Sequence, residues 1–183
     1  MATHAILNPT RIAAQDVNSY NRSVLSGSDI DNGNVFTLVG QNAVAGQTEV
    51  WDAIWPTTGS VIGLWMANAP EVVVTVSGNN KFRGIDVDPR NFYTSASTVF
   101  DAFRLQPGDI ILLSADAFAS GTPASAFAQA TVDSFKWTWT NDGSTYASVT
   151  TLKYVSTDYF SVGSGSAIGT SHVPAYKMRV VSN

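Results

Sequence analysis

Short apolar runs that end in turn residues dominate the chain from Val35 onward. The stretches at 34–40 and 71–80 are rich in Val, Thr and Phe and end in Gly or Asn. β-branched and aromatic residues favour strands, whereas Gly and Asn favour turns. Between two further apolar runs, Pro107 followed by Gly108 fits the centre of a type II turn. No segment keeps the period of a long amphipathic helix, so the pattern predicts an all-β fold, a single small barrel or sandwich.

The clearest hairpin signal lies in residues 135–156. Phe135, Trp137 and Trp139 alternate with polar residues, and Asn141-Asp142-Gly143 follows as the expected reversal. Alternate residues of a strand share one face, so the two tryptophans point the same way. Because each ring can bury well over ~100 Å², we interpret this pair as core or subunit-interface residues rather than as a ligand site.

The first 27 residues lack this alternation. Their apolar positions are dispersed among Asn, Pro, Arg and Gln, and the segment closes with Ser26-Gly27-Ser28. It has too little apolar mass to fold by itself, so it must dock either on its own domain or on a partner. We therefore divide the chain into an extended N-terminal arm at 1–27 and a β domain at 28–183. Removal of residues 1–25 is expected to leave that domain folded.

An acidic stretch, Asp29-Ile30-Asp31-Asn32-Gly33-Asn34, stands where the arm meets the domain. In a helix-loop-helix calcium loop a third oxygen ligand would occupy the position of Gly33, and a Glu would follow several residues later. Neither condition is met. Asn-Gly tolerates left-handed backbone angles and reverses the chain. We interpret Asp31, Asn32 and Gly33 as a turn or hinge, with no metal site.

Composition narrows the range of functions. Charged residues make up 13% of the chain, against about 25% in typical soluble domains, and the net charge is −4. The ten Lys and Arg residues are scattered, so direct nucleic-acid binding is not expected. The apolar runs are too short to span a bilayer, and the start lacks a signal-peptide pattern. These features indicate a chain made in the cytoplasm, without membrane contact, whose weakly charged exterior is suited to contacts with neighbouring subunits.

Candidate catalytic groups are sparse. The chain has no Cys and only two His, His4 and His172, and it lacks the Gly-rich phosphate motifs and the nucleophile elbow. Asp86 and Asp88 share a face if they lie on a strand. Asp88 precedes Pro89, however, which favours a strand end or a turn. We therefore predict a protein that is not an enzyme and has no cofactor.

The order of several segments resembles the small head-decoration (capsid cement) proteins of tailed bacteriophages. A polar arm is followed by DIDNGNVFTLVG, VWDAIWP, GLWMANAPEVVV and FRLQPGDIILLS, which together span about Asp29 to Ser114. The resemblance implies a β-domain protein that attaches to the outside of an assembled major-capsid lattice, commonly at local symmetry axes, and strengthens it against internal DNA pressure. The implied location is the exterior of the virion, and no catalytic residue comes with the family.

Such a protein can bind by laying its arm across adjacent subunits, where strand addition supplies backbone hydrogen bonds. The expected capsid contacts are the apolar anchors and cations of the arm: Ile6, Leu7, Arg11, Ile12, Tyr20 and Arg22. Docking of the same side chains onto their own domain is the open alternative. Contacts between copies would add avidity, so a homo-oligomer is expected, with a trimer as one option.

Two other functions remain open. A phage tail-tube or tail-tip subunit would share the β domain and the arm, but would assemble into rings or tubes without a capsid. A carbohydrate-binding β module would instead present exposed tryptophans beside Asp and Asn donors. Trp51, Trp55 and Trp65 are the candidates for such a platform.

Overall fold

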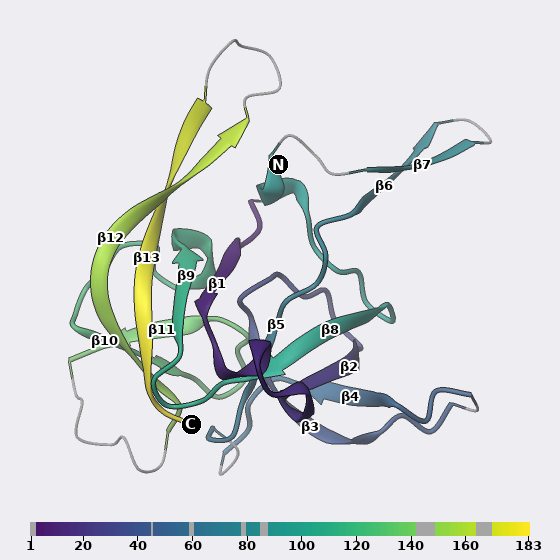
Figure 1. The fold of residues 1–183 in the computed structure, drawn as a ribbon, viewed down its shortest axis with the longest axis horizontal. Coiled ribbons are helices and arrows are strands. Elements are labelled where there is room, and N and C mark those ends of the chain that lie inside the picture. Colours follow the sequence, from purple (N-terminus) through teal and green to yellow (C-terminus); the bar gives the residue numbers. More distant parts are fainter. Residues whose placement is uncertain are drawn as a thin grey trace.

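The computed structural model describes residues 3–44, 46–58, 61–77, 80–84, 88–141, 149–163 and 170–183. Within these residues the chain forms thirteen β-strands and four single-turn 3₁₀ helices, and no longer helix. The all-β prediction is therefore confirmed. The strands build a six-stranded sheet, a closed five-stranded barrel and a separate two-stranded hairpin (Figure 1).

The six-stranded sheet is antiparallel and has the order β1-β9-β13-β12-β10-β11. Its strands are β1 (Leu7–Arg11), β9 (Ile110–Ser114), β10 (Phe127–Ala130), β11 (Trp137–Thr140), β12 (Thr151–Gly163) and β13 (Thr170–Ser182). Buried and half-buried residues alternate along β10 and β11, as expected when one face of a sheet covers a core.

The hairpin predicted for residues 135–156 is wrong. β11 pairs with β10, and β10 in turn pairs with β12, so β10 separates the two strands that the sequence pattern joined. Most of the expected reversal, Asp142-Gly143, lies outside the described residues. The alternation itself was informative, because Trp137 and Trp139 are both buried in the core.

The barrel has the order β2-β4-β3-β5-β8, so the predicted barrel is present beside a separate sheet. Its strands are β2 (Asn21–Ser26), β3 (Val35–Gln41), β4 (Val50–Ile54), β5 (Trp65–Ala67) and β8 (Val99–Arg104). β2 runs parallel to β4, and the other pairs are antiparallel. The 3₁₀ helices are η1 (Ala13–Gln15), η2 (Asn18–Tyr20), η3 (Pro89–Asn91) and η4 (Ala115–Ala117).

Sheet and barrel share buried side chains. In the largest hydrophobic cluster, Leu113, Trp137 and Met178 from the sheet join Met66 and Phe103 from the barrel. A second cluster fills the barrel, with members Val24, Ile30, Phe36, Ala53, Phe92 and Phe100. Burial of such side chains is the main favourable contribution to folding. The two parts therefore stabilise each other.

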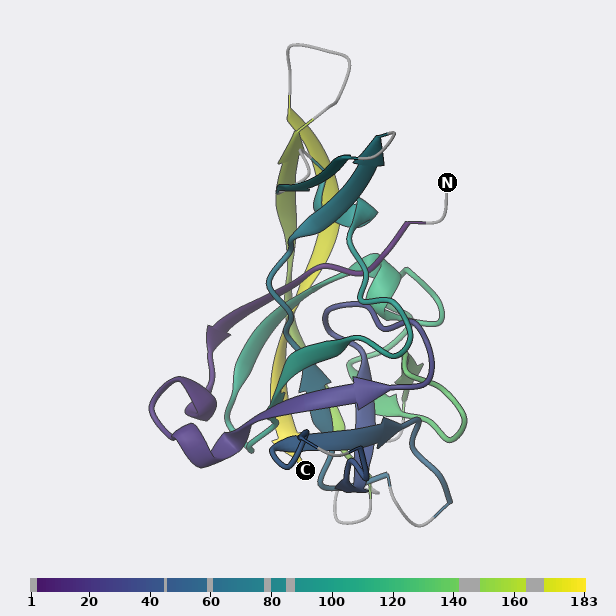
Figure 2. The same cartoon turned by 90° about the vertical axis from the view of Figure 1, so that its right-hand side faces the viewer.

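A separate N-terminal arm is not clearly shown. Residues 7–11 form β1 at the edge of the sheet beside β9, and residues 21–26 form β2 between β4 and β8 of the barrel (Figure 2). Ile6, Leu7 and Ile12 are all buried. The first 27 residues thus follow the intramolecular alternative. They contribute strands to both parts of the fold, in place of an arm that is free to bind a partner.

Two hairpins project from the same end of the molecule (Figures 1 and 2). One is formed by β12 and β13. β9 pairs with β13 only at Ala175–Arg179, and β10 pairs with β12 only at Thr151–Lys153. The outer part of this hairpin therefore pairs with no third described strand. The other is formed by β6 (Val73–Ser77) and β7 (Asn80–Gly84), which pair only with each other among the described strands. We call the two hairpins together the fork.

Candidate binding surfaces

The acidic loop at 29–34 holds the N-terminal segment in place. The Asp31 Oδ1 atom lies 2.7 Å from His4 Nδ1, and Oδ2 accepts a hydrogen bond from the backbone N–H of Ala5. The His4 ring also stacks on Tyr93, with 4.6 Å between ring centroids. Both oxygens of this carboxylate are therefore used within the chain. Asn34 closes the turn by accepting the Asp31 N–H with its side-chain oxygen.

Asn32 and Gly33, in the same loop, join the barrel to the sheet. The Asn32 side chain accepts the N–H of Ala69 and donates to its carbonyl oxygen, at 2.8 and 3.0 Å. The Gly33 N–H donates to the carbonyl of Ala67, and the Gly33 carbonyl accepts from Trp137 Nε1. Gly33 has φ = +87°, so the left-handed turn expected from Asn-Gly is present. The loop is a clamp between two parts of the fold.

The candidate catalytic groups that the structure describes do not converge. Among the described residues no group of three His, Cys, Asp or Glu side chains lies close enough to hold a metal ion. Asp88 is paired with Arg90, whose Nη2 lies 2.6 Å from Asp88 Oδ2, and this hydrogen bonding lowers the pKa of Asp88. Asp86 lies outside the described residues. His172 is exposed on β13, where its ring lies near Tyr159.

The tryptophans proposed as a sugar platform differ in exposure. Trp55 is 44% exposed and packs at an angle on Phe135. Trp51 and Trp65 are half-buried. The Arg22 guanidinium lies 5.8 Å from the centroid of the Trp65 ring, in a cation–π contact that covers part of that face. Of the three candidate rings, Trp55 is therefore the one most open to a ligand.

The six predicted capsid-contact residues are not gathered into one site. Ile6, Leu7 and Ile12 are buried within this chain, as expected if the segment docks on its own domain, and their contact with a capsid stays a prediction. Tyr20 is partly buried against the main core, and Arg22 lies over Trp65. Of the six, Arg11 is the one exposed residue, at the end of β1.

A groove of about 530 Å³ lies between the outer part of the long hairpin and the segment that leads into the β6–β7 hairpin. Its walls come from β1, the segment at 68–71, η3 and the outer part of β12. Ile6, Leu7, Pro9, Phe160 and Val162 are among its apolar lining residues.

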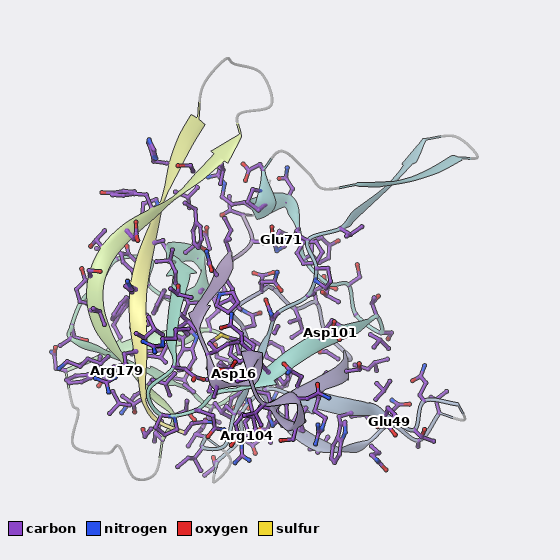
Figure 3. All side chains as sticks on the ribbon, viewed as in Figure 1. Asp16, Glu49, Glu71, Asp101, Arg104 and Arg179 are labelled. Atoms are coloured by element: carbon purple, nitrogen blue, oxygen red, sulfur yellow. The ribbon has the colours of Figure 1, made fainter. Side chains whose placement is uncertain are left out.

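The groove also contains Glu71, which Figure 3 places between the long hairpin and the β6–β7 hairpin. Burial raises the pKa of the Glu71 carboxyl, and hydrogen bonding with the Asn32 side chain opposes the shift. Among the described side chains no cation forms an ion pair with this carboxylate.

A second surface is the outer face of the six-stranded sheet, which the cores leave uncovered. Lys153 on β12 and Arg179 on β13 are direct cross-strand partners, and both are exposed. Lys177, two residues before Arg179, shares this face. A hollow of about 470 Å³ beside Lys153 and Arg179 has Phe127 and Val181 in its lining. We call this surface the cationic face.

A third surface lies on the barrel, where β8 and β4 flank β2. Asp101 on β8 is opposite Ser23, and Asp52 on β4 is opposite Leu25. The Ser23 hydroxyl lies 3.5 Å from Asp101 Oδ1, and Asn42 Nδ2 lies 2.5 Å from Asp52 Oδ1. Neither carboxylate forms an ion pair with a described cation. We call this surface the acidic face.

None of these surfaces was predicted from the sequence. Glu71 looked like the start of a strand, and its place in a groove depends on β12, which lies about ninety residues later in the chain. Lys177 and Arg179 carried a signal, because their spacing of two on a strand puts them on one face. Lys153 joins them only through the register of β12 against β13.

Comparisons of the chain with protein-family models, with curated proteins and with solved structures found no match. In the part of the chain that the structure describes, no helix has the length and apolar character needed to cross a membrane.

Proposed function

We propose that this protein is a structural component of a phage particle that attaches to the outer surface of the major-capsid lattice and stabilises it. The observation that carries the proposal is the fork. Its two hairpins project from one end of the molecule. Among the described strands, β6 and β7 pair only with each other, and the outer part of the β12–β13 hairpin has no third strand. The resemblance of residues 29–114 to capsid cement proteins supports the same function.

Projecting hairpins of this kind are suited to binding another protein. A two-stranded hairpin is marginally stable in water on its own, and its open edges can pair with a strand of a partner. On the long hairpin Val155 is 53% exposed and Tyr159 is 57% exposed. A partner that covers these side chains gains the free energy of removing apolar area from water. The capsid protein would take that place.

The groove adds chemical selectivity to this contact. Glu71 carries a carboxylate that burial already disfavours in its charged form, and no described cation compensates it. A Lys or Arg of the capsid protein that enters the groove would remove this cost, and the apolar walls would exclude water around the pair. The capsid segment in this groove is therefore expected to be cationic with apolar neighbours.

The test is binding to capsids. Purified protein is mixed with undecorated capsid shells of the phage whose genome encodes this chain. Co-sedimentation measures the affinity, and electron cryomicroscopy locates the density of the bound protein. The double variant Val155→Thr with Tyr159→Ser should bind at least about tenfold more weakly. Val39→Thr, an exposed position on barrel strand β3, is the matched control. Failure of the wild-type protein to bind would overturn the proposal.

The same assay tests the groove. Glu71→Gln keeps the size of the side chain and removes its charge, so it should weaken capsid binding and reduce its dependence on salt. Glu49→Gln changes an exposed carboxylate in the loop before β4 and serves as the control. If the two variants bind equally well, the groove does not take a cation.

A further inference from the structure

We infer that the cationic face of one copy binds the acidic face of another copy, so that the chain assembles head to tail. The inference deepens the proposed function, because it assigns the surfaces through which neighbouring decoration subunits meet. It rests on charge complementarity between two uncovered surfaces of the same chain.

The cationic face contains an arrangement that is unfavourable in an isolated chain. Lys153 and Arg179 lie directly opposite each other on adjacent strands, and like charges in such positions repel. No described carboxylate forms an ion pair with either of them. Apart from Asp158, on the outer part of β12, the six strands of the sheet contain no Asp or Glu. Among the described residues, the strands of this sheet thus supply no carboxylate to Lys153 and Arg179, and the acidic groups of a second copy could do so.

The same face has the shape and apolar content of a contact surface. The hollow beside Lys153 and Arg179 has Phe127, Val180 and Val181 in its lining. A carboxylate that enters such a hollow is partly shielded from water, which strengthens its attraction to the cations. Half-buried Leu112 on β9, the cross-strand partner of Lys177, extends the surface.

The acidic face offers the matching chemistry. Asp52 and Asp101 lie on either side of β2, and neither has a cationic partner among the described side chains. Val99 beside them is 43% exposed, and Leu25 is half-buried. The acidic face thus presents two carboxylates flanked by apolar side chains. The cationic face presents cations that are flanked by apolar side chains in the same way.

The placement of the two faces determines the kind of assembly. Figure 3 shows Arg179 and Asp101 on opposite sides of the molecule. A contact between two different faces is heterologous, and its repetition gives a closed ring or an open filament. In a ring around a symmetry axis of the capsid, each copy would bind its neighbour through these faces and bind the capsid lattice through its fork. The two kinds of contact would then add avidity.

Charge reversal tests the pairing in solution, without any capsid. Sedimentation velocity of the full chain over a range of concentrations should show self-association that weakens as salt rises. Lys153→Glu with Arg179→Glu should weaken it at least about tenfold, and so should Asp52→Lys with Asp101→Lys. An equimolar mixture of these two double variants should associate again, because each then offers the face that the other lacks. Thermal unfolding of each variant checks that it is folded.

Charge reversal elsewhere is the control: Asp16→Lys with Lys136→Glu should leave association unchanged. A wild-type protein that stays monomeric at every concentration at low salt would overturn the inference, and so would a mixture of double variants that fails to associate. These outcomes are separate from those of the capsid assay. A chain that decorates capsids but never self-associates keeps the proposed function and removes only the head-to-tail contact.

Discussion

The carboxylate of Asp109 accepts a hydrogen bond from the backbone N–H of Ala13, with 2.9 Å between Oδ1 and N. Its other oxygen accepts the N–H of Gln106 at 2.8 Å. Asp109 is only 4% exposed, and burial raises its pKa while these two donors act in the opposite direction. One side chain in the turn before β9 thus fixes the segment that leads from β1 to β2.

Replacement of this side chain should be costly. Asp109→Ala leaves the N–H groups of Ala13 and Gln106 without their acceptor, and each unsatisfied group in a poorly hydrated site costs about 1–3 kcal/mol. We expect the free energy of unfolding to fall by about 3 kcal/mol, as measured by urea denaturation. Asp16→Ala, at an exposed position close by, should change it by less than about 0.5 kcal/mol. Equal effects of the two substitutions would contradict the role given to Asp109.

Gly33 is required for two independent reasons. It has φ = +87°, and a Cβ atom added there would lie 2.6 Å from Leu113 Cδ2. Gly33→Ala should therefore lower the free energy of unfolding by about 3 kcal/mol, through backbone strain together with displacement of a core side chain. Gly63 also has a positive φ, +73°, but nothing lies within 4 Å of its added Cβ. Gly63→Ala isolates the backbone effect and should cost about 1 kcal/mol, so similar values for both would exclude the clash.

Local signals in the sequence predicted local structure well. The expected type II turn is confirmed: Gly108 has φ = +101°, and the N–H of Asp109 donates to the carbonyl of Gln106. The alternation around Trp137 and Trp139 predicted core or subunit-interface residues, and the structure places both in the core. Turns and strand faces depend on a few adjacent residues, so the chain itself contains the information needed to predict them.

Strand neighbours could not be predicted in this way. The turn signal after Thr140 favoured pairing of β11 with β12, yet residues 127–130 occupy the place between them. Those residues are Phe-Ala-Gln-Ala, a short run with weak strand preference. Long-range packing decides such pairings, and a single sequence does not show it. The Glu71 groove and the cationic face depend on the same pairings.

The place of the N-terminal segment also depends on long-range pairing. β1 is an edge strand with Pro9 inside it, and its register against β9 shifts between Asn8 and Arg11. An edge strand with an irregular register shows no regular alternation of buried and exposed residues. Its dispersed apolar positions therefore predicted an arm, although its apolar residues enter the core.

A truncation tests this placement. A chain that starts at residue 27 lacks β1 and β2, so β4 and β8 lose their shared neighbour and the core loses Leu7, Ile12 and Val24. The combined loss should exceed the whole stability of a typical domain, about 5–15 kcal/mol. We expect an unfolded or aggregated product, with poor dispersion in an amide NMR spectrum. A chain that starts at Thr3 should give a dispersed spectrum; if the longer truncation does so too, the first 26 residues are a dispensable arm after all.

The Glu71 carboxyl gives the fold a definite pH dependence. Burial raises its pKa above the ordinary value of 4.5, so the folded state binds a proton more tightly than the unfolded state. Its contribution to stability is fully present below the pKa of the unfolded chain and is lost as pH rises through the higher pKa of the folded chain. At neutral pH the charged carboxylate therefore opposes folding in the free protein.

Glu71→Gln should remove this pH-dependent loss. Relative to wild type, the free energy of unfolding of the variant should increase as pH rises from about 4 to 7, by less than about 1 kcal/mol because the groove is partly open to solvent. Urea denaturation at a series of pH values measures the difference, with Glu49→Gln as the background. The same substitution should weaken capsid binding. It therefore separates a role in binding from a role in folding, because replacing a residue that is needed only for folding would not make the free protein more stable and the complex weaker. A variant that is less stable than wild type at pH 7 would show instead that the charge on Glu71 is already compensated within the chain.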